Sequence, residues 1–147
     1  MILCDLKDAL YLTDQYVKLR NLWAKNLLTD DVNEKETLEW LHEKSVVILV
    51  ACEEDEVVGA SILYLEKEGE IAIFVKRKRS GVGTTLLKEI QAQAKNKNIK
   101  KLWAWISDTN IASKKLFEKN KFNADKPCSR VFSGTIYNGM VYEMEII

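Results

Sequence analysis

The sequence predicts an α/β fold in which about four helices are layered against a mixed, mostly antiparallel sheet of six or seven strands. Two helical segments come first, and three strand-like segments joined by short polar turns follow them. A helix, a strand, a helix and two more strands complete the chain. Short turns join antiparallel neighbours, whereas a strand after a helical crossover lies parallel to the strand before it. We therefore expect one parallel pair in an otherwise antiparallel sheet.

Two helices are predicted near the N-terminal end. Residues 8–27 carry a broad apolar face at helical spacing, which includes Leu10, Val17 and Trp23. A second helix fits residues 33–43, with Asn33 as its N-cap and Glu36 at the spacing of a capping box.

The remaining elements follow from apolar runs and turn residues. Strands are expected at 46–52, 57–65 and 70–75, and their short turns indicate an antiparallel meander. The crossover helix covers 81–97, and the strand at 99–106 does not alternate, so we expect it to be buried on both faces. A helix at 110–120 follows, and then strands at 130–137 and 140–147 flank Asn138-Gly139, a hairpin signal.

Composition restricts the class of protein. The 147 residues are 47% hydrophobic and include one proline and no Ser/Gly-rich linker, so we expect residues 1–147 to form a single domain. A net charge of zero argues against a nucleic-acid partner. No apolar run approaches the ~20 residues that span a bilayer, and no secretory signal is evident. We therefore expect a cytosolic protein with no membrane partner.

Cysteine and histidine usage argues against a metal centre. Cys4, Cys52 and Cys128 lie far apart without a C-x-x-C pair, which favours buried free thiols. The chain has a single histidine, His42, and no cluster of metal-ligating residues. We therefore expect no metal cofactor.

A glycine turn between a strand and a helix is the strongest functional signal. Four consecutive cations, residues 76–79, precede Ser80-Gly81-Val82-Gly83, where the crossover helix begins. Free N–H groups and the helix dipole favour an anion at a helix N-terminus, and glycine lets the backbone approach closely. The basic block could be a solvated surface, a polyanion site or a phosphate site. Its fusion to the glycine turn favours a phosphorylated ligand.

Two motifs in this order resemble the GCN5-related N-acetyltransferase (GNAT) superfamily. The segment Lys78-Arg79-Ser80-Gly81-Val82-Gly83 is similar to that family's phosphate loop, Arg/Gln-x-x-Gly-x-Gly/Ala, with lysine in the first position. The segment 110–122 is similar to Asn-x-x-Ala-x-x-Leu-Tyr-x-Lys-x-Gly-Phe. Here Ser113 replaces the alanine, Phe117 the tyrosine and Lys121 the glycine. The resemblance is best over residues 46–122.

This resemblance implies that acetyl-CoA binds in a V-shaped opening between the third strand and the strand after the crossover helix. Backbone groups of Phe74 and Val75 are then expected to pair with the pantetheine amides like an added strand. The pyrophosphate is expected at the turn, and Phe117 against the pantetheine end. Asn110 is expected either to contact the cofactor or to cap its own helix, and the two roles are compatible. The expected turn residues are Lys78, Arg79, Ser80, Gly81, Val82, Gly83 and Thr84.

The catalytic groups are less well specified. An amine must lose its proton before it attacks a thioester, and Glu70 opens the strand that the resemblance places beside the cofactor, so it is the candidate base. Alternatively, Glu70 is a solvated residue of the preceding turn. The usual acid position holds Phe117, which cannot donate a proton. Either the thiolate leaves unaided or another group substitutes, with Tyr137 and Tyr142 as candidates.

The expected function is direct acetyl transfer from acetyl-CoA to a primary amine. A Leu-Arg-Asn stretch and a later Trp-Leu resemble a subgroup that acetylates nucleotide-linked amino sugars, and Arg20 is the candidate contact for an anionic acceptor. Other small amines remain open as acceptors, and so do peptide or protein amines. A catalytically silent acyl-CoA-binding or regulatory module is the alternative from another class. Homodimer formation is also open.

Overall fold

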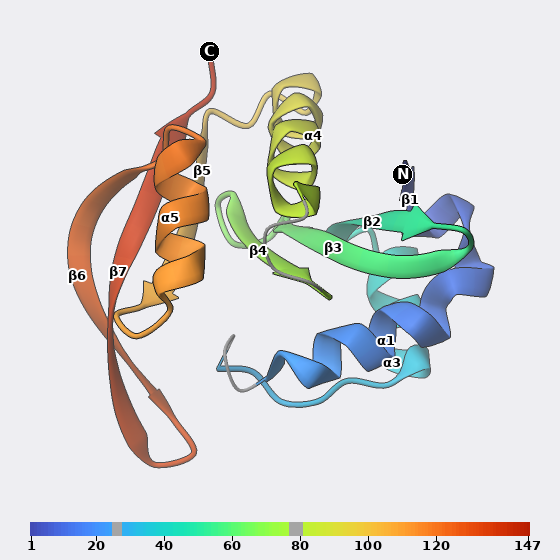
Figure 1. The fold of residues 1–147 in the computed structure, drawn as a ribbon, viewed down its shortest axis with the longest axis horizontal. Helices are drawn as coiled ribbons and strands as arrows, with labels where there is room; N and C mark the ends of the chain where they lie inside the picture. Colours follow the sequence, from blue (N-terminus) through green and yellow to red (C-terminus); the bar gives the residue numbers. More distant parts are fainter. Residues whose placement is uncertain (25–27, 77–80) are drawn as a thin grey trace.

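The computed structural model describes residues 1–24, 28–76 and 81–147. Figure 1 shows their fold. The helices are the short 3-10 helices η1 (Leu6–Asp8) and η2 (Leu10–Leu12), followed by α1 (Thr13–Leu22), α3 (Glu34–His42), α4 (Val82–Asn96) and α5 (Ile111–Lys119). The strands are β1 (Ile2–Asp5), β2 (Val46–Glu53), β3 (Glu56–Tyr64), β4 (Glu70–Val75), β5 (Lys101–Ser107), β6 (Asn123–Phe132) and β7 (Thr135–Glu145).

The strands form one seven-stranded mixed sheet in the order β1-β2-β3-β4-β5-β7-β6. β2, β3 and β4 form the predicted antiparallel meander, and β5 lies parallel to β4 after the α4 crossover. The parallel strands pair at one position, Glu70 opposite Trp103, and a backbone bond from Trp103 N–H to Gly69 O lies beside it. The two strands then separate (Figure 1). The predicted fold class and the splayed central pair are therefore confirmed.

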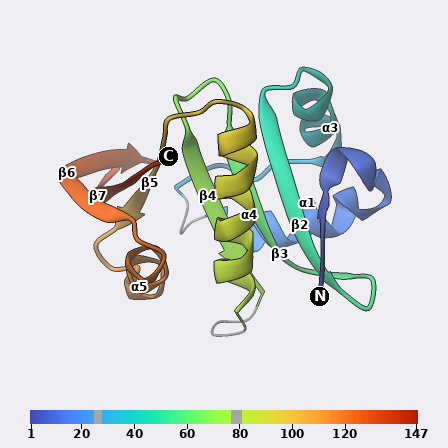
Figure 2. The same ribbon diagram turned by 90° about the horizontal axis from the view of Figure 1, so that it is seen from above.

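Two apolar clusters hold helices against opposite faces of the sheet. Figure 2 shows α4 lying across β2, β3 and β4 on one face, with α1 and α3 on the far side. The α4 cluster includes Leu63, Leu86, Ile90 and Leu102, and it extends to Phe117 of α5. The second cluster joins η1, η2 and α1 to the meander. Helices thus cover both faces of the meander.

The N-terminal segment differs from the prediction at two points. Residues 2–5 form β1, an edge strand that pairs with β2 and was not expected. The helix predicted over 8–27 begins only at Thr13, because Ala9 has non-helical dihedral angles (φ −142°, ψ 54°) between η1 and η2. Residues 25–27 lie outside the described part of the chain. The predicted cap of α3 is confirmed, since Asn33 Oδ1 accepts from Glu36 N–H at 2.8 Å.

The prediction of a C-terminal hairpin at Asn138-Gly139 was wrong. The turn lies at Ser133-Gly134, where both residues have positive φ (50° and 78°), as a two-residue hairpin turn requires. Asn138 and Gly139 lie inside β7. Gly139 is needed for another reason: a Cβ there would overlap the Trp105 ring and lie 2.7 Å from Ile106 O. The glycine serves close packing, not a turn.

The prediction that residues 99–106 are buried on both faces was also wrong. In β5, Leu102, Ala104 and Ile106 are buried in the α4 cluster, whereas Trp103 and Trp105 alternate with them and are only partly buried. The alternation was hidden in the sequence because tryptophan reads as apolar on either face. Both indoles use their N–H groups, Trp103 to Lys67 O at 3.1 Å and Trp105 to Cys128 O at 2.7 Å.

Several sequence-based expectations concern the chemistry and the surroundings of the protein. All three cysteines are free, as predicted, although only Cys52 is fully buried. Burial raises the pKa of the Cys52 thiol to about 11. Within the described residues, no helix is long and apolar enough to cross a membrane, and no group of three or more His, Cys, Asp or Glu could hold a metal ion. The cytosolic location stays a prediction, and homodimer formation stays open.

Candidate active site

A cleft opens where β4 and β5 separate. It encloses about 170 Å³, and residues from β4, β5, α5, β6 and the segment after α1 line it. Among the predicted site residues, Glu70, Asn110 and Phe117 lie in its wall. The splay of the strands therefore brings the candidate base and two candidate cofactor contacts to one place.

The start of α4 forms the first part of the predicted cofactor side. Gly81 occupies the N-cap position with φ 77°, a conformation that glycine adopts at little cost, and no side chain caps the helix. The first helical bond runs from Thr85 N–H to Gly81 O at 3.1 Å. The N–H groups of residues 81–84 therefore belong to the set that has no partner within a helix. Lys78, Arg79 and Ser80 lie outside the described residues.

The remaining turn residues bring α4 close to its neighbours. A Cβ on Gly83 would lie 2.9 Å from Leu116 Cδ2, so this glycine allows α4 to approach α5. Val82 is buried, and its Cγ1 would lie 2.7 Å from a Cβ on Gly59. Thr84 Oγ1 accepts from Asn120 Nδ2 at 3.5 Å. The Val82 side chain is thus used in packing, which leaves its backbone as the group that could meet a ligand.

Phe74 and Val75 lie on the part of β4 that has separated from β5. The Phe74 side chain is buried against Tyr16, with ring centroids 5.9 Å apart, and Val75 packs against the α4 cluster. Only their backbone is therefore suited to the predicted pairing with pantetheine amides. Lys76, the next residue, is ion-paired with Glu56 of β3.

Asn110 and Phe117 come from the first two turns of α5. Asn110 is the N-cap, because its Oδ1 accepts from Ser113 N–H at 3.2 Å. This bond uses the side-chain carbonyl, so the amide group is not committed by it. Phe117 packs edge-on against Phe122 with ring centroids 4.9 Å apart, and it closes the cleft floor as a nonpolar surface.

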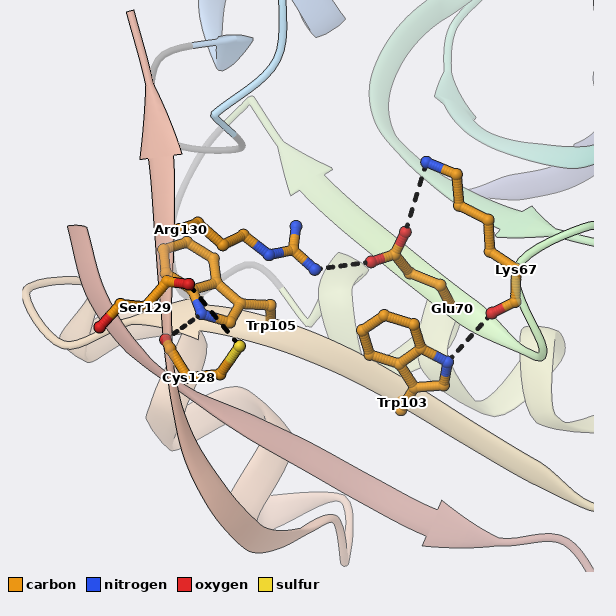
Figure 3. Close-up of polar contacts among 7 residues, drawn as sticks. All are labelled: Lys67, Glu70, Trp103, Trp105, Cys128, Ser129 and Arg130. Atoms are coloured by element: carbon orange, nitrogen blue, oxygen red, sulfur yellow. Dashed lines mark hydrogen bonds and ion pairs between the residues drawn. The ribbon is translucent and has the colours of Figure 1, made fainter. Parts of the chain in front are cut away.

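Glu70 lies at the narrow end of the cleft, where the two strands still pair. Its carboxylate is largely buried, with 11% of the side chain exposed, and its two oxygens face different cations. Oε2 accepts from Arg130 Nη2 at 3.0 Å, and Oε1 lies 3.9 Å from Lys67 Nζ. Figure 3 shows the carboxylate between these two side chains. Glu70 is therefore not a solvated turn residue.

Arg130 lies in the cleft wall and is a candidate that the sequence did not reveal. It belongs to β6, at the far edge of the sheet, and its guanidinium carbon lies 5.0 Å from the centre of the Trp105 ring (Figure 3). It reaches Glu70, sixty positions away in sequence, because β6 and β7 curve beside β5. The wrongly predicted hairpin turn hid the position of Arg130. With the turn at Ser133-Gly134, Arg130 lies opposite Tyr137.

The two candidate acids lie outside the cleft wall. Tyr142 is 4% exposed, and its hydroxyl donates to Glu118 Oε1 at 3.2 Å. Burial, followed by the bond to Glu118, raises the pKa of Tyr142. Tyr137 is partly buried on β7. Neither tyrosine is part of the surface that contains Glu70.

Arg20, the candidate acceptor contact, is also absent from the cleft wall. It is 5% exposed on α1, and its guanidinium carbon lies 5.8 Å from the centre of the Trp40 ring. Within the described residues, Nε and Nη1 of Arg20 have no hydrogen-bond partner. The structure thus places this arginine against α3 and not beside Glu70.

The family model of the acetyltransferase (GNAT) family matches residues 14–122, which include both the Gly81 turn and α5. The chain belongs to this family. A curated relative from Bacillus subtilis, named "Putative phosphinothricin acetyltransferase YwnH", is 33% identical over 106 residues. The match covers 64% of this GNAT chain and 65% of that relative, so it spans just under two thirds of either protein.

Solved structures share the whole GNAT fold at low sequence identity. A ribosomal-protein-alanine N-acetyltransferase from Brucella melitensis is 19% identical, with a TM-score of 0.84 and 99% of each chain covered. A GNAT phosphinothricin acetyltransferase from Sinorhizobium meliloti, solved in complex with acetyl-CoA, is 16% identical with a TM-score of 0.78. That match covers 99% of this chain and 88% of the neighbour.

Proposed function

We propose that this protein is an acetyl-CoA-dependent N-acetyltransferase that transfers the acetyl group directly to a primary amine of a small acceptor. The observation that carries the proposal is the position of Glu70. Its carboxylate lies in the same cleft as Asn110 and Phe117, at the point where β4 and β5 separate. The candidate base and two candidate cofactor contacts therefore share one cleft.

The described residues suit acetyl-CoA on three counts. The separated part of β4 offers backbone groups to an extended amide-containing chain. The uncapped start of α4, with Gly81 in the left-handed region, offers N–H groups to a pyrophosphate. Phe117 offers a nonpolar surface in the cleft wall. The S. meliloti neighbour was solved with the same molecule bound.

The chemical step requires one proton transfer before bond formation. The acceptor arrives as an ammonium ion, and the Glu70 carboxylate accepts its proton, directly or through water. The amine lone pair then forms the C–N bond with the thioester carbonyl carbon, the nitrogen releases its second proton to solvent, and the C–S bond breaks. The electron pair of that bond leaves on sulfur, and solvent protonates the thiolate.

We assign no protein acid to the departing thiolate. Phe117 occupies the position at which the family usually has a tyrosine, and it cannot donate a proton. Tyr142 already donates to Glu118. A thiol with a reference pKa of about 8.5 is acidic enough for its anion to leave unaided.

The proposed acceptor is a small amine, because the cleft of about 170 Å³ is small and its narrow end holds Glu70. Two proteins to which this chain is similar are named as phosphinothricin acetyltransferases. The B. melitensis neighbour is named for a protein acceptor. Nucleotide-linked amino sugars, small amines and peptide amines are therefore the classes to compare.

An acceptor screen tests the proposal. The purified chain is mixed with acetyl-CoA and amino acids, amino sugars, nucleotide-linked amino sugars, polyamines or peptides, and release of CoA thiol is measured. We expect turnover with at least one small amine. Acetyl-CoA binding without turnover across all classes would instead support a silent acyl-CoA-binding module, which Phe117 at the acid position favours as the second candidate. Absence of acetyl-CoA binding by calorimetry would overturn both.

A further inference from the structure

We infer that Arg130 binds an anionic group of the acceptor, so that the substrate class is a primary amine carrying a nearby carboxylate or phosphate. The inference rests on the proposed function and specifies its acceptor. It also gives a role to the ion pair between β4 and β6, Glu70 and Arg130.

The Trp105 ring supports the guanidinium of Arg130. The guanidinium lies over this ring, 5.0 Å from its centre. That ring is itself fixed, because its N–H donates to Cys128 O at 2.7 Å and because Gly139 leaves no space between the ring and β7. A stacked guanidinium on a fixed ring loses little further freedom when it binds a ligand.

Part of the Arg130 guanidinium is available to bind a ligand. Only Nη2 is bonded to Glu70, and within the described residues no acceptor is bonded to Nε or Nη1 of Arg130. The side chain is 36% exposed, and Arg130 lies in the cleft wall. Arginine has five N–H donors in a planar fork, which suits two parallel bonds to a carboxylate or a phosphate. A second anion can therefore bind without breaking the existing pair.

The local charge also favours an anionic acceptor. Glu70 has two cationic neighbours in the cleft wall, Arg130 and Lys67, so the three side chains together carry one excess positive charge. An amine with no acidic group brings a second positive charge to this cluster. An amine with an acidic group brings a compensating negative charge and can place its ammonium beside Glu70 and its anion beside Arg130.

Spacing restricts the acceptor further. Glu70 Oε2 and Arg130 Nη2 are 3.0 Å apart, so the groups that bind to them must be close neighbours in the substrate. An α-amino acid meets this requirement, and so does a 2-amino sugar 1-phosphate, whose phosphate lies on the carbon next to the amine. A long polyamine has no anion to place beside Arg130.

Matched acceptor pairs test the inference with the intact chain. Each pair differs in the anion alone: an amino acid and its primary amide for the carboxylate, and glucosamine 1-phosphate and glucosamine for the phosphate. We expect kcat/KM to favour the anionic member of one pair by about 10- to 100-fold, the size of a charge-assisted hydrogen bond. The pair that shows this preference identifies which anion is used.

Variants then connect the preference to Arg130. Arg130→Gln is expected to reduce the anionic-to-neutral ratio to about one, mainly by raising KM of the anionic acceptor, while acetyl-CoA affinity is unchanged. Arg130→Lys keeps the charge but not the fork, and it should retain part of the ratio. Lys100→Gln, which removes an exposed charge outside the cleft wall, is the matched control and should leave the ratio intact.

The experiments distinguish a failure of this inference from a failure of the proposed function. Neutral and anionic amines used equally well by the native chain would overturn the inference and leave the proposed function standing. A preserved ratio in folded Arg130→Gln would also overturn it. Acetyl-CoA binding with no turnover of any amine would overturn the proposed function and, with it, the inference. If Arg130→Gln does not fold by circular dichroism, the native ratio and Arg130→Lys decide the outcome.

Discussion

The proposed cofactor side and the proposed acceptor side of the site are built by different means. The proposed cofactor side consists of the start of α4, which lies outside the cleft wall, the separated part of β4 and the start of α5, and it presents mainly backbone groups and one aromatic surface. The acceptor side consists of Glu70, Trp105 and Arg130, whose side chains come from β4, β5 and β6. Backbone recognition needs short local motifs, whereas side-chain recognition needs correct long-range register. This difference explains why the sequence indicated most of the proposed cofactor side but only Glu70 on the proposed acceptor side.

Substitution of Glu70 should separate the two sides most clearly. Glu70→Gln removes the proton acceptor without changing side-chain size, and we expect kcat to fall by about 10²- to 10⁴-fold. Calorimetry should show unchanged acetyl-CoA affinity, because the glutamate lies on the acceptor side. An unchanged rate would exclude Glu70 as the base.

Substitution of Gly81 should have the opposite effect. Gly81→Glu places a negative charge at the start of α4, and we expect the Kd for acetyl-CoA to rise by about 10- to 100-fold, in line with the favoured charge at a helix N-terminus. Gly81→Ala is the control. Nothing lies within 4 Å of a Cβ there, so alanine meets only the strain of φ 77°, about 1 kcal/mol. Equal affinity of the glutamate variant and the native chain would show that the ligand phosphates bind elsewhere.

A Cβ on Gly139 should disturb the acceptor side through Trp105. Gly139→Ala forces the indole away from β7, and we expect the free energy of unfolding to fall by about 1–3 kcal/mol, as in overpacked cores. The preference for anionic acceptors should fall with it. Gly134→Ala, which meets open space at φ 78°, should cost only about 1 kcal/mol and keep the preference. Urea titration and acceptor kinetics measure both effects.

Tyr142 should matter for stability and not for turnover. Tyr142→Phe removes the hydrogen bond to Glu118, and we expect a loss of about 1 kcal/mol in the free energy of unfolding. The turnover number should stay within about twofold of native, below the contribution of a general acid. A hundredfold fall in kcat with acetyl-CoA would restore Tyr142 as the acid.

The smallest expected effect lies at the end of α5, away from both sides. Lys121 adopts φ 69° where the family usually has glycine, a conformation that strains a side chain bearing a Cβ. Lys121→Gly should raise the free energy of unfolding by about 0.5–1 kcal/mol and leave acetyl-CoA affinity and acceptor preference unchanged. A destabilised variant would mean that the lysine side chain makes a contribution larger than the strain.

The errors in the sequence-based interpretation concern features that depend on long-range strand register. Asn138-Gly139 has the composition of a hairpin turn, but Ser133-Gly134 also supplies two residues that accept positive φ, and only the pairing of β6 with β7 chooses between them. That choice moves Arg130 relative to Trp105. The burial of β5 was misjudged for a related reason, since an indole can pack in a core or form the support beneath an arginine.

The sequence by itself determined the order of elements, the meander with its parallel crossover, the glycine turn at the start of α4 and the cap of α5. These features depend on local periodicity, φ preference and capping, which act over a few residues. Only the tertiary structure decided where Glu70 meets a cation, where Arg20 is buried and why Gly139 is a glycine. Those outcomes depend on contacts between strands far apart in the chain, and a shift of one residue in register moves every side chain to the other face.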